Sequence, residues 1–182
     1  MSLAIALLTV SDRRSADPSS GDPSGDALQE RLETAGHRLI ERRLVPDDRY
    51  AIRAVISGWI ADAAVQVVIS TGGTGLTGRD GSPEAVAPLL DKTIEGFGEL
   101  FRVLSFESIG TSTLQSRALA GVANGTVIFV LPGSLDAVTT AWDRLIRAQL
   151  DAGTRPCNLV QLLPRLGESP DGAVVSAPPP HG

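Results

Sequence analysis

A glycine-rich segment near the middle of the chain has residue types suited to binding an anion. It reads STGGTGLTGRD, runs from Ser70 to Asp80, and directly follows the mostly apolar residues 65–69. Glycines adopt positive φ readily and carry no Cβ, so their N–H groups can turn inward around a phosphate. The glycines concerned and the hydroxyl donors beside them are Gly72, Gly73, Gly75, Thr71, Thr74 and Thr77. An ordinary strand-to-helix turn is the alternative, but a turn needs fewer glycines.

Asp80 ends this segment, and its carboxylate would repel a phosphate held by the glycines. One interpretation is a helix cap exposed to solvent. The other is a Mg²⁺ site, because Mg²⁺ is commonly held by one or two carboxylates together with phosphate oxygens. The neighbouring Arg79 would add a fixed positive charge. The residue types alone leave these two interpretations equally open.

Other segments also combine a structural interpretation with a functional one. Ser24 can cap a helix or, with Gly25, contact a ligand, and the cap is the simpler interpretation. Asp47 follows a predicted strand and by itself resembles a helix cap. Asp12 follows the first strand and could face the same pocket as the glycine segment. A Pro-Gly-Ser turn precedes the last predicted helix, where either a cap or an anion site is possible: Pro132, Gly133 and Ser134.

Alternating strand and helix signals are expected to position these residues. Apolar, partly β-branched runs predict strands at 3–10, 65–69 and 126–131, and a more highly charged segment predicts another at 37–45. Helical spacing of apolar residues predicts helices at 24–35, 47–63, 82–104 and 134–149, with a short one at 113–119. Such alternation indicates an α/β fold with a mostly parallel sheet and helices on both faces. Ligands in these folds bind outside the carboxyl ends of the strands, so one pocket built from several loops is expected.

Composition excludes several classes of protein and site. A formal net charge of −5 argues against nucleic-acid and acidic-membrane binding. A single lysine, Lys92, and two histidines, His37 and His181, argue against a Ser-His-Asp triad or a multi-histidine metal site. No apolar run reaches the roughly 18 residues of a membrane span. The lone Cys157 cannot form an internal disulfide, which favours the cytoplasm, and we expect its thiol to be buried.

One domain is expected over residues 1–163, with no internal repeat. Residues 164–182 are rich in Pro and Gly and lack an apolar pattern. We expect this tail to be disordered or loosely laid on the surface.

Several segments together resemble a known family. They read IALLTVSDRR, VPDDRYAIRA, STGGTGLTGRDGSPEA, EGFGELFRVLSFESIGTSTLQSRALAG and IFVLPGS. In this order they resemble the MoaB/MogA/gephyrin-type molybdopterin-binding family, over roughly residues 3 to 160, and lean toward its protein B branch. A related phosphate-ligand enzyme of the competence-damage type is the more distant alternative, and the run through LQSRALAG argues against it.

The resemblance implies a three-layer α/β/α fold, a molybdopterin-binding domain at 1–163 and a role in molybdenum cofactor biosynthesis. It implies an adenylyltransferase that uses ATP and Mg²⁺, releases pyrophosphate and passes the activated pterin to the molybdenum-insertion enzyme. A non-catalytic molybdopterin carrier is the alternative. The family also implies a homotrimer or homohexamer.

The resemblance carries over to individual positions. The family's glycine motif falls on residues 72–75, and its aspartate after that loop falls on Asp80. A second aspartate falls on Asp47, and together the two would hold Mg²⁺ and serve catalysis. The serine-glycine pair falls on Ser24 and Gly25, and the Pro-Gly-Ser turn on 132–134. Ser82 stands where the family commonly has Thr and retains a capping hydroxyl.

Overall fold

A six-stranded mixed sheet forms the centre of the protein in this computed structural model, which describes residues 1–168. Its strands are β1 Ala4–Val10, β2 Arg38–Val45, β3 Val67–Thr71, β4 Lys92–Thr93, β5 Leu119–Ala123 and β6 Thr126–Leu131. The order across the sheet is β2-β1-β3-β6-β5-β4. β1, β2, β3 and β6 pair in parallel, whereas β5 pairs antiparallel with β6 and β4. The predicted mostly parallel central sheet is confirmed.

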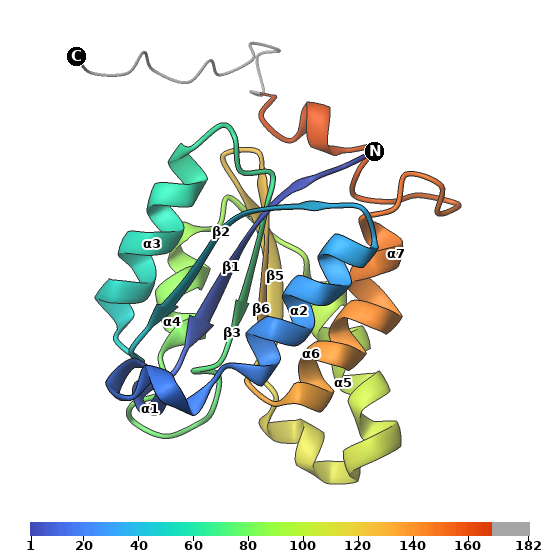
Figure 1. Cartoon of the computed structure of the whole chain (residues 1–182). Helices are drawn as coiled ribbons and strands as arrows, with labels where there is room; N and C mark the ends of the chain where they lie inside the picture. The colour runs from blue at the N-terminus through green and yellow to red at the C-terminus, as the bar shows by residue number, and fades with distance from the viewer. Residues whose placement is uncertain (169–182) are drawn as a thin grey trace, which may run out of the picture.

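Helices cover both faces of the sheet and complete the expected three layers (Figure 1). On one face lie α2 Pro23–Thr34, α5 Glu95–Ile109, α6 Leu135–Ala141 and α7 Arg147–Gln149, the last two joined by a π-helical turn at Trp142–Ile146. On the other face lie α3 Arg49–Ala61 and α4 Ser82–Val86. The short α1 Asp12–Ala16 follows β1. Short 3₁₀ turns occupy Pro18–Ser20, Ala87–Leu89, Gly110–Gln115 and Leu163–Arg165.

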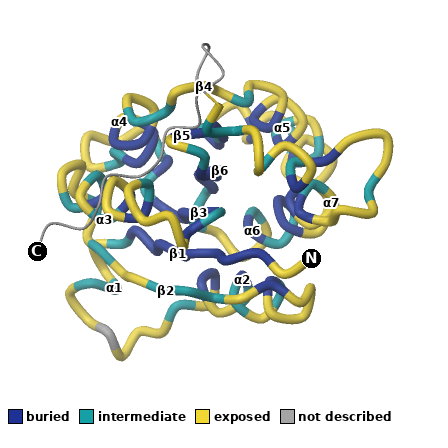
Figure 2. The backbone as a smooth tube through the Cα atoms, turned by 90° about the horizontal axis from the view of Figure 1, so that it is seen from above, coloured by how far each residue is buried: buried dark blue, intermediate teal, exposed yellow. Residues whose placement is uncertain are grey.

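Strand β1 is almost entirely apolar because helices cover both of its faces. Ile5 and Leu7 pack into the core beneath α2, α5 and α6, while Ala6 and Leu8 pack into the core beneath α3 and α4. Successive side chains of a strand point to opposite faces, so a strand covered on both faces needs apolar residues at every position. Figure 2 shows this strand buried through the centre of the molecule. The four parallel strands all end at the same edge of the sheet, and the loops that contain the candidate site residues begin there.

Some predicted elements differ from the structure. The segment predicted as a helix at 113–119 forms the end of a 3₁₀ turn and the start of β5. Strands β4 and β5 were not predicted, and β4 divides the single helix predicted at 82–104 into α4 and α5. The short α1 lies between the first predicted strand and the first predicted helix. Cys157 is exposed, not buried.

The described residues contain no helix both long and apolar enough to cross a membrane. Of the tail predicted at 164–182, residues 164–168 are described and begin within the last 3₁₀ turn, and the remainder lies outside the described residues.

Candidate functional site

Three loops at the carboxyl ends of the strands are joined by hydrogen bonds, at the lower edge of Figure 1. Thr71 Oγ1, at the end of β3, donates to the carbonyl oxygen of Pro132 at 2.9 Å. Ser24 Oγ, at the start of α2, donates to the carbonyl oxygen of Gly133 at 2.8 Å. The structure thus brings together the loops that the sequence analysis expected to share one pocket.

Two of the predicted helix caps have a different role. Ser24 lies within α2, whose N-cap is Asp22. Ser82 is the first residue of α4, and its hydroxyl donates to the carbonyl oxygen of Gly72 at 2.8 Å. Both hydroxyls therefore fix the site loops instead of capping a helix. Ser134 caps α6, as predicted.

The glycines of the loop make room for the two predicted aspartates. Gly73 has φ of 64°, and a Cβ there would lie 2.7 Å from Asp47 Oδ2. A Cβ on Gly75 would lie 2.5 Å from Asp80 Oδ2. A real Cβ atom does not approach another heavy atom that closely, so a side chain at either position would displace a carboxylate. The loop needs glycine where the two acids approach its backbone.

Asp80 folds back onto its own loop. Its Oδ2 accepts hydrogen bonds from Thr77 Oγ1 at 2.5 Å and from Thr77 N at 2.9 Å. The Thr77 hydroxyl bond is the main cause that lowers the pKa of Asp80 below its usual value. The N-cap position of α4 belongs to Gly81, and Asp80 makes no capping bond there. The interpretation of Asp80 as a helix cap is therefore wrong, and its carboxylate is ionised at neutral pH.

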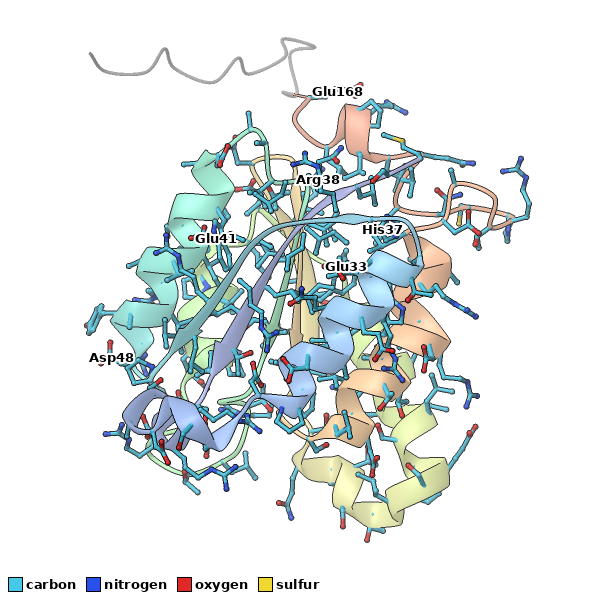
Figure 3. All side chains as sticks on the ribbon, in the orientation of Figure 1. Glu33, His37, Arg38, Glu41, Asp48 and Glu168 are labelled. Atoms are coloured by element: carbon cyan, nitrogen blue, oxygen red, sulfur yellow. The ribbon has the colours of Figure 1, made fainter. Side chains whose placement is uncertain are left out.

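Asp47 joins the loop after β2 to the start of α4. Its Oδ1 accepts a hydrogen bond from Gly81 N at 3.1 Å. Partial burial raises the pKa of Asp47, and the negative charges of Asp80 and Asp12 raise it further, against the Gly81 bond that lowers it. The cap of α3 is the next residue, Asp48, labelled at the start of that helix in Figure 3. Asp47 is thus a carboxylate in a region of excess negative charge, where a cation would be stabilised.

Asp12 and Arg79 are paired with each other. Arg79 Nη2 lies 2.7 Å and Nε 3.0 Å from Asp12 Oδ2. The other oxygen of Asp12 accepts from the backbone N–H of Asp47 at 3.0 Å. Arg79 keeps 72% of its side chain exposed, so its guanidinium borders the site from the solvent side. The pair connects α1, the loop after β2 and the glycine loop.

Few side chains at this site could bind a divalent cation. In the described part of the chain, no group of three or more His, Cys, Asp or Glu side chains is arranged to hold a metal ion. Asp47 lies against Gly73 and Asp80 against Gly75 of the same loop, and each offers carboxylate oxygens. Mg²⁺ typically takes one or two carboxylates and completes its shell with water and phosphate oxygens. The donor set therefore fits Mg²⁺ in the presence of a phosphate ligand.

A cavity of about 320 Å³ opens beside the glycine loop. One wall is Thr74 and Gly75, the second is α5 with its 3₁₀ extension, and the third is the start of α6. Hydroxyl and amide side chains dominate its polar lining: Thr74, Ser105, Ser108, Ser112, Gln115, Ser116, Ser134 and Thr140. Phe101, Ile109 and Ala137 add apolar surface. Asp136 adds a carboxylate, and the lining as a whole suits a ligand with hydrogen-bonding groups placed next to the glycine loop.

Asp22 is a structural residue at the edge of the site that the motifs did not single out. Its carboxylate accepts from Thr9 Oγ1 at 2.6 Å and from Arg42 Nη2 at 2.9 Å, with 13% of the side chain exposed. Burial acts to raise the pKa of Asp22, but the bonds from Thr9 and Arg42 outweigh it and lower the pKa. The Asp-Pro pair at the start of α2 was the available signal, since it matches an N-cap followed by a first-turn proline.

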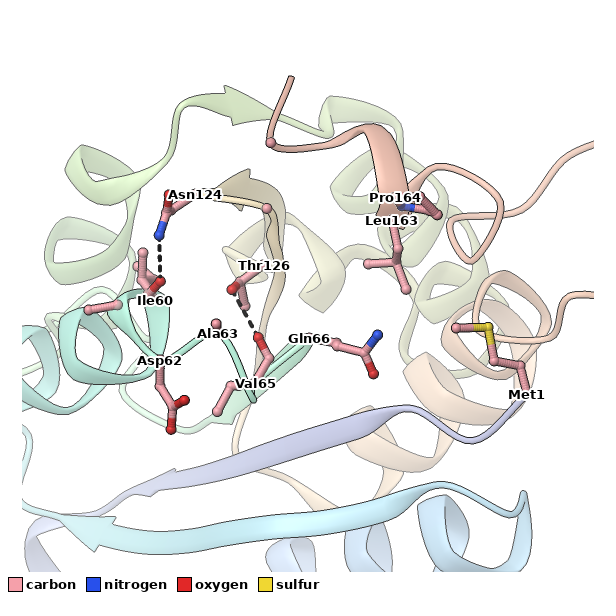
Figure 4. Close-up of a pocket in the computed structure, with 13 residues that line it drawn as sticks. Met1, Ile60, Asp62, Ala63, Val65, Gln66, Asn124, Thr126, Leu163 and Pro164 are labelled. Atoms are coloured by element: carbon pink, nitrogen blue, oxygen red, sulfur yellow. Dashed lines mark hydrogen bonds between the residues drawn. The ribbon is translucent and has the colours of Figure 1, made fainter. Parts of the chain in front are cut away.

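A second cavity, of about 350 Å³, lies at the opposite end of the sheet (Figure 4). Its polar side chains Asn124 and Thr126 donate to the carbonyl oxygens of Ile60 and Val65, at 3.0 and 3.1 Å. These bonds fix the turn between β5 and β6 to the end of α3. This cavity is remote from every predicted site residue.

Comparison with known proteins identifies the family. A model described as a probable molybdopterin binding domain matches residues 6–152. Molybdenum cofactor biosynthesis protein B of Escherichia coli strain K12 is 58% identical over 154 residues, 85% of this chain and 89% of that protein. The chain belongs to the MoaB branch of the molybdopterin-binding family. The resemblance seen in its motifs is confirmed, as are a role in molybdenum cofactor biosynthesis and molybdopterin binding at the level of the family.

Solved structures of MoaB proteins have the same fold. A crystal structure of a molybdenum cofactor biosynthesis protein B superposes with a TM-score of 0.81 at 36% identity, covering 93% of this chain and 98% of the other. The tungsten cofactor synthesizing protein MoaB of Pyrococcus furiosus superposes with a TM-score of 0.73 at 36% identity, covering 80% and 91% of the two chains. The edge that carries the glycine loop therefore belongs to a fold shared among MoaB proteins.

Proposed function

We propose that this MoaB family member adenylylates molybdopterin, using Mg-ATP and releasing pyrophosphate. The observation that carries the proposal is the placement of Asp47 and Asp80 against neighbouring glycines of one loop, beside a hydroxyl-lined cavity. Two carboxylates so close to an anion-binding loop would repel a polyphosphate, and a cation bound between them would offset this repulsion. The cavity supplies room and hydrogen-bonding groups for the pterin.

The proposed reaction needs no general base. The terminal phosphate of molybdopterin attacks the α-phosphorus of ATP, a P–O bond forms, and the bond to pyrophosphate breaks. A phosphate monoester is already largely dianionic at neutral pH, since its second pKa is about 6. The amides of Gly73 and Thr74 and the guanidinium of Arg79 would bind and orient the two anions, while the Gly72 amide donates to the Leu131 carbonyl at 3.0 Å and holds the loop in place. Mg²⁺ held by Asp47 and Asp80 would neutralise charge on the phosphates.

Pyrophosphate release that depends on ATP, Mg²⁺ and added molybdopterin tests the activity. Asp47→Asn and Asp80→Asn should each lower the rate by at least about 100-fold, as expected for lost electrostatic stabilisation of a transferring phosphoryl group. Asp48→Asn is the matched control, because Asp48 caps α3 next to the site and Asn caps a helix equally well. Normal rates in both site variants would refute the role of these acids.

A molybdopterin carrier without transferase activity is the second candidate. It is favoured by the observation that Asp80 is bound to Thr77 and Arg79 to Asp12, so neither group is free in this structure. A carrier would bind molybdopterin with the same affinity in the presence and absence of Mg-ATP and would release no pyrophosphate.

We further propose that the protein self-associates, as a trimer or hexamer, and passes its product to the molybdenum-insertion enzyme. Large apolar side chains are exposed along α5 and its 3₁₀ extension: Leu100, Val103, Phe106, Ile109 and Leu114. Such a concentration of exposed apolar residues is typical of an interaction surface. The reaction is proposed for the cytoplasm, in keeping with the single cysteine of the chain.

A further inference from the structure

Arg117 makes contacts with the glycine loop that neither the motifs nor the proposed reaction explain. It lies between the 3₁₀ turn after α5 and strand β5, with 26% of its side chain exposed. Its Nε donates to the carbonyl oxygen of Thr74 at 3.1 Å, and its Nη2 donates to that of Asp80 at 3.4 Å. Its Nη1 pairs with Glu84 of α4. One guanidinium therefore contacts both limbs of the loop and the helix that follows.

The loop needs such a contact because most of it has no regular secondary structure. Residues 72–81 connect β3 to α4, and the few backbone bonds in this stretch include Ser82 N to the Gly73 carbonyl at 2.9 Å and Asp80 N to the Thr77 carbonyl at 3.1 Å. The second bond closes only the turn that carries Asp80. Arg117 joins that turn to Thr74 and so restricts the separation between Asp80 and the glycines.

The chemistry of the contact requires arginine. A guanidinium has five donors in a rigid planar fork and can bond several carbonyl oxygens in fixed directions, whereas a lysine ammonium is a compact charge on a flexible stem. The positive charge of Arg117 also contributes to lowering the pKa of Asp80, after the Thr77 bonds and against partial burial. A lysine would retain part of the charge effect and lose the bridging geometry.

The residue before Arg117 faces the cavity. Ser116 lines it, and its buried Oγ has no hydrogen-bond partner among the described residues. A buried hydroxyl without a partner is costly unless a ligand or water satisfies it. The segment 116–117 thus has one side chain at the cavity wall and the next on the glycine loop.

We propose that Arg117 is a positioning residue, which holds the two limbs of the glycine loop together and sets the place of Asp80 relative to the cavity. The inference rests on the proposed role of Asp80 in binding Mg²⁺ with ATP. Arg117 itself contacts neither substrate nor metal in this scheme.

Arg117→Lys tests the proposal, with Arg53→Lys as the matched control. Arg53 also donates to backbone carbonyls, those of Glu84 and Ala85 at 2.8 and 3.1 Å, but it does not touch the glycine loop. Arg117→Lys should raise the half-saturating Mg²⁺ concentration for pyrophosphate release by about 10- to 100-fold, the range typical of residues that orient metal ligands. The half-saturating molybdopterin concentration should stay within about twofold, and Arg53→Lys should change neither.

Hydrogen exchange of the ligand-free protein provides a readout independent of activity. Arg117→Lys should speed exchange of the amides at 72–81 and leave peptides from β1 and β6 unchanged. Equal exchange in both variants, or faster exchange throughout the chain, would overturn the positioning role. If wild-type protein released no pyrophosphate, the proposed function would fail, and the exchange pattern alone would decide the inference about Arg117.

Discussion

The carboxylate of Asp47 accepts a hydrogen bond from the backbone N–H of Gly81 at 3.1 Å, and this bond joins the loop after β2 to the start of α4. It brings a residue from the loop after the second strand into contact with the end of the glycine loop after the third. Partial burial raises the pKa of Asp47 in spite of this bond, whereas the hydroxyl of Thr77 is the main cause that lowers the pKa of Asp80. The two acids should therefore respond differently to substitution and to pH.

Asp47→Asn should reduce activity without reducing stability. Its folded-state pKa is raised, so the folded protein binds the proton more tightly than the unfolded chain does, and the ionised group opposes folding at neutral pH. An Asn retains an oxygen that can accept from Gly81 and removes the charge. Urea unfolding at pH 7 should show a free energy of unfolding equal to or above that of wild type, within about 1 kcal/mol. A clear loss of stability would show that the charge of Asp47 is structural.

Gly73→Ala should abolish most of the activity, because Gly73 has φ of 64° and the added Cβ would lie 2.4 Å from Ser82 Oγ and 2.7 Å from Asp47 Oδ2, which must both move. A displacement on the scale of 1 Å in a site that orients reactants can cost about 100-fold in rate. Gly78→Ala in the same loop is the control, since no atom of the described residues lies within 4 Å of the Cβ it would add. Equal rates in the two variants would contradict the close approach of Asp47 to the loop.

Much of the fold was predictable because its signals are local and continuous. The apolar runs of β1 and β6 and the glycines after β3 need no knowledge of distant residues. β5, with the sequence LAGVA, is short and built of small side chains, and it pairs antiparallel in a sheet that the pattern predicted as mostly parallel. β4 has only two residues, which are too few to show the alternating pattern of a strand. Both strands depend on tertiary pairing more than on their own composition.

The site was predictable as a set of loops but not as a set of contacts. Asp22 accepts hydrogen bonds from Thr9 and Arg42, which are 13 and 20 positions away, and no local sequence pattern predicts these contacts. Arg117 reaches Thr74 across 43 positions for the same reason. By contrast, the bond from Thr77 to Asp80 spans three residues and could have been anticipated from Thr-x-x-Asp.

Asp22→Asn should destabilise the fold by about 2 kcal/mol at pH 7, the scale of a hydrogen bond to a charged group. Asp26→Asn is the control, because Asp26 pairs with the same Arg42 at 2.7 Å but keeps 66% of its side chain exposed. That variant should change the free energy of unfolding little. The folded-state pKa of Asp22 is lowered, so its contribution is present above the usual value of 3.8 and is lost as pH falls below it. Denaturant titrations of wild type and Asp22→Asn should therefore differ at pH 7 and converge in acid.

His37 should make stability depend on pH in a higher range. Its Nδ1 accepts a hydrogen bond from Leu3 N at 3.3 Å, which requires the neutral imidazole. Burial is the main cause that lowers the pKa of His37 below the usual 6.5. Its contribution is therefore present above pH 6.5 and is lost as pH falls through the lower folded-state value. Thermal unfolding between pH 7 and pH 5 should show a fall in Tm that His37→Gln largely removes, and an equal fall in that variant would point to other groups.

Phe106→Ser should weaken self-association and leave the fold intact, because Phe106 is 57% exposed on α5 and contributes little to the core. Removing a large aromatic side chain from the centre of an interface commonly costs about 2 kcal/mol or more. Light scattering over a range of concentrations should show wild type as an oligomer and the variant shifted toward the monomer. Leu162→Ser is the control, since Leu162 is exposed to a comparable 45% but lies outside α5 and its extension. A monomeric wild type, or an equal shift in the control, would contradict association through α5.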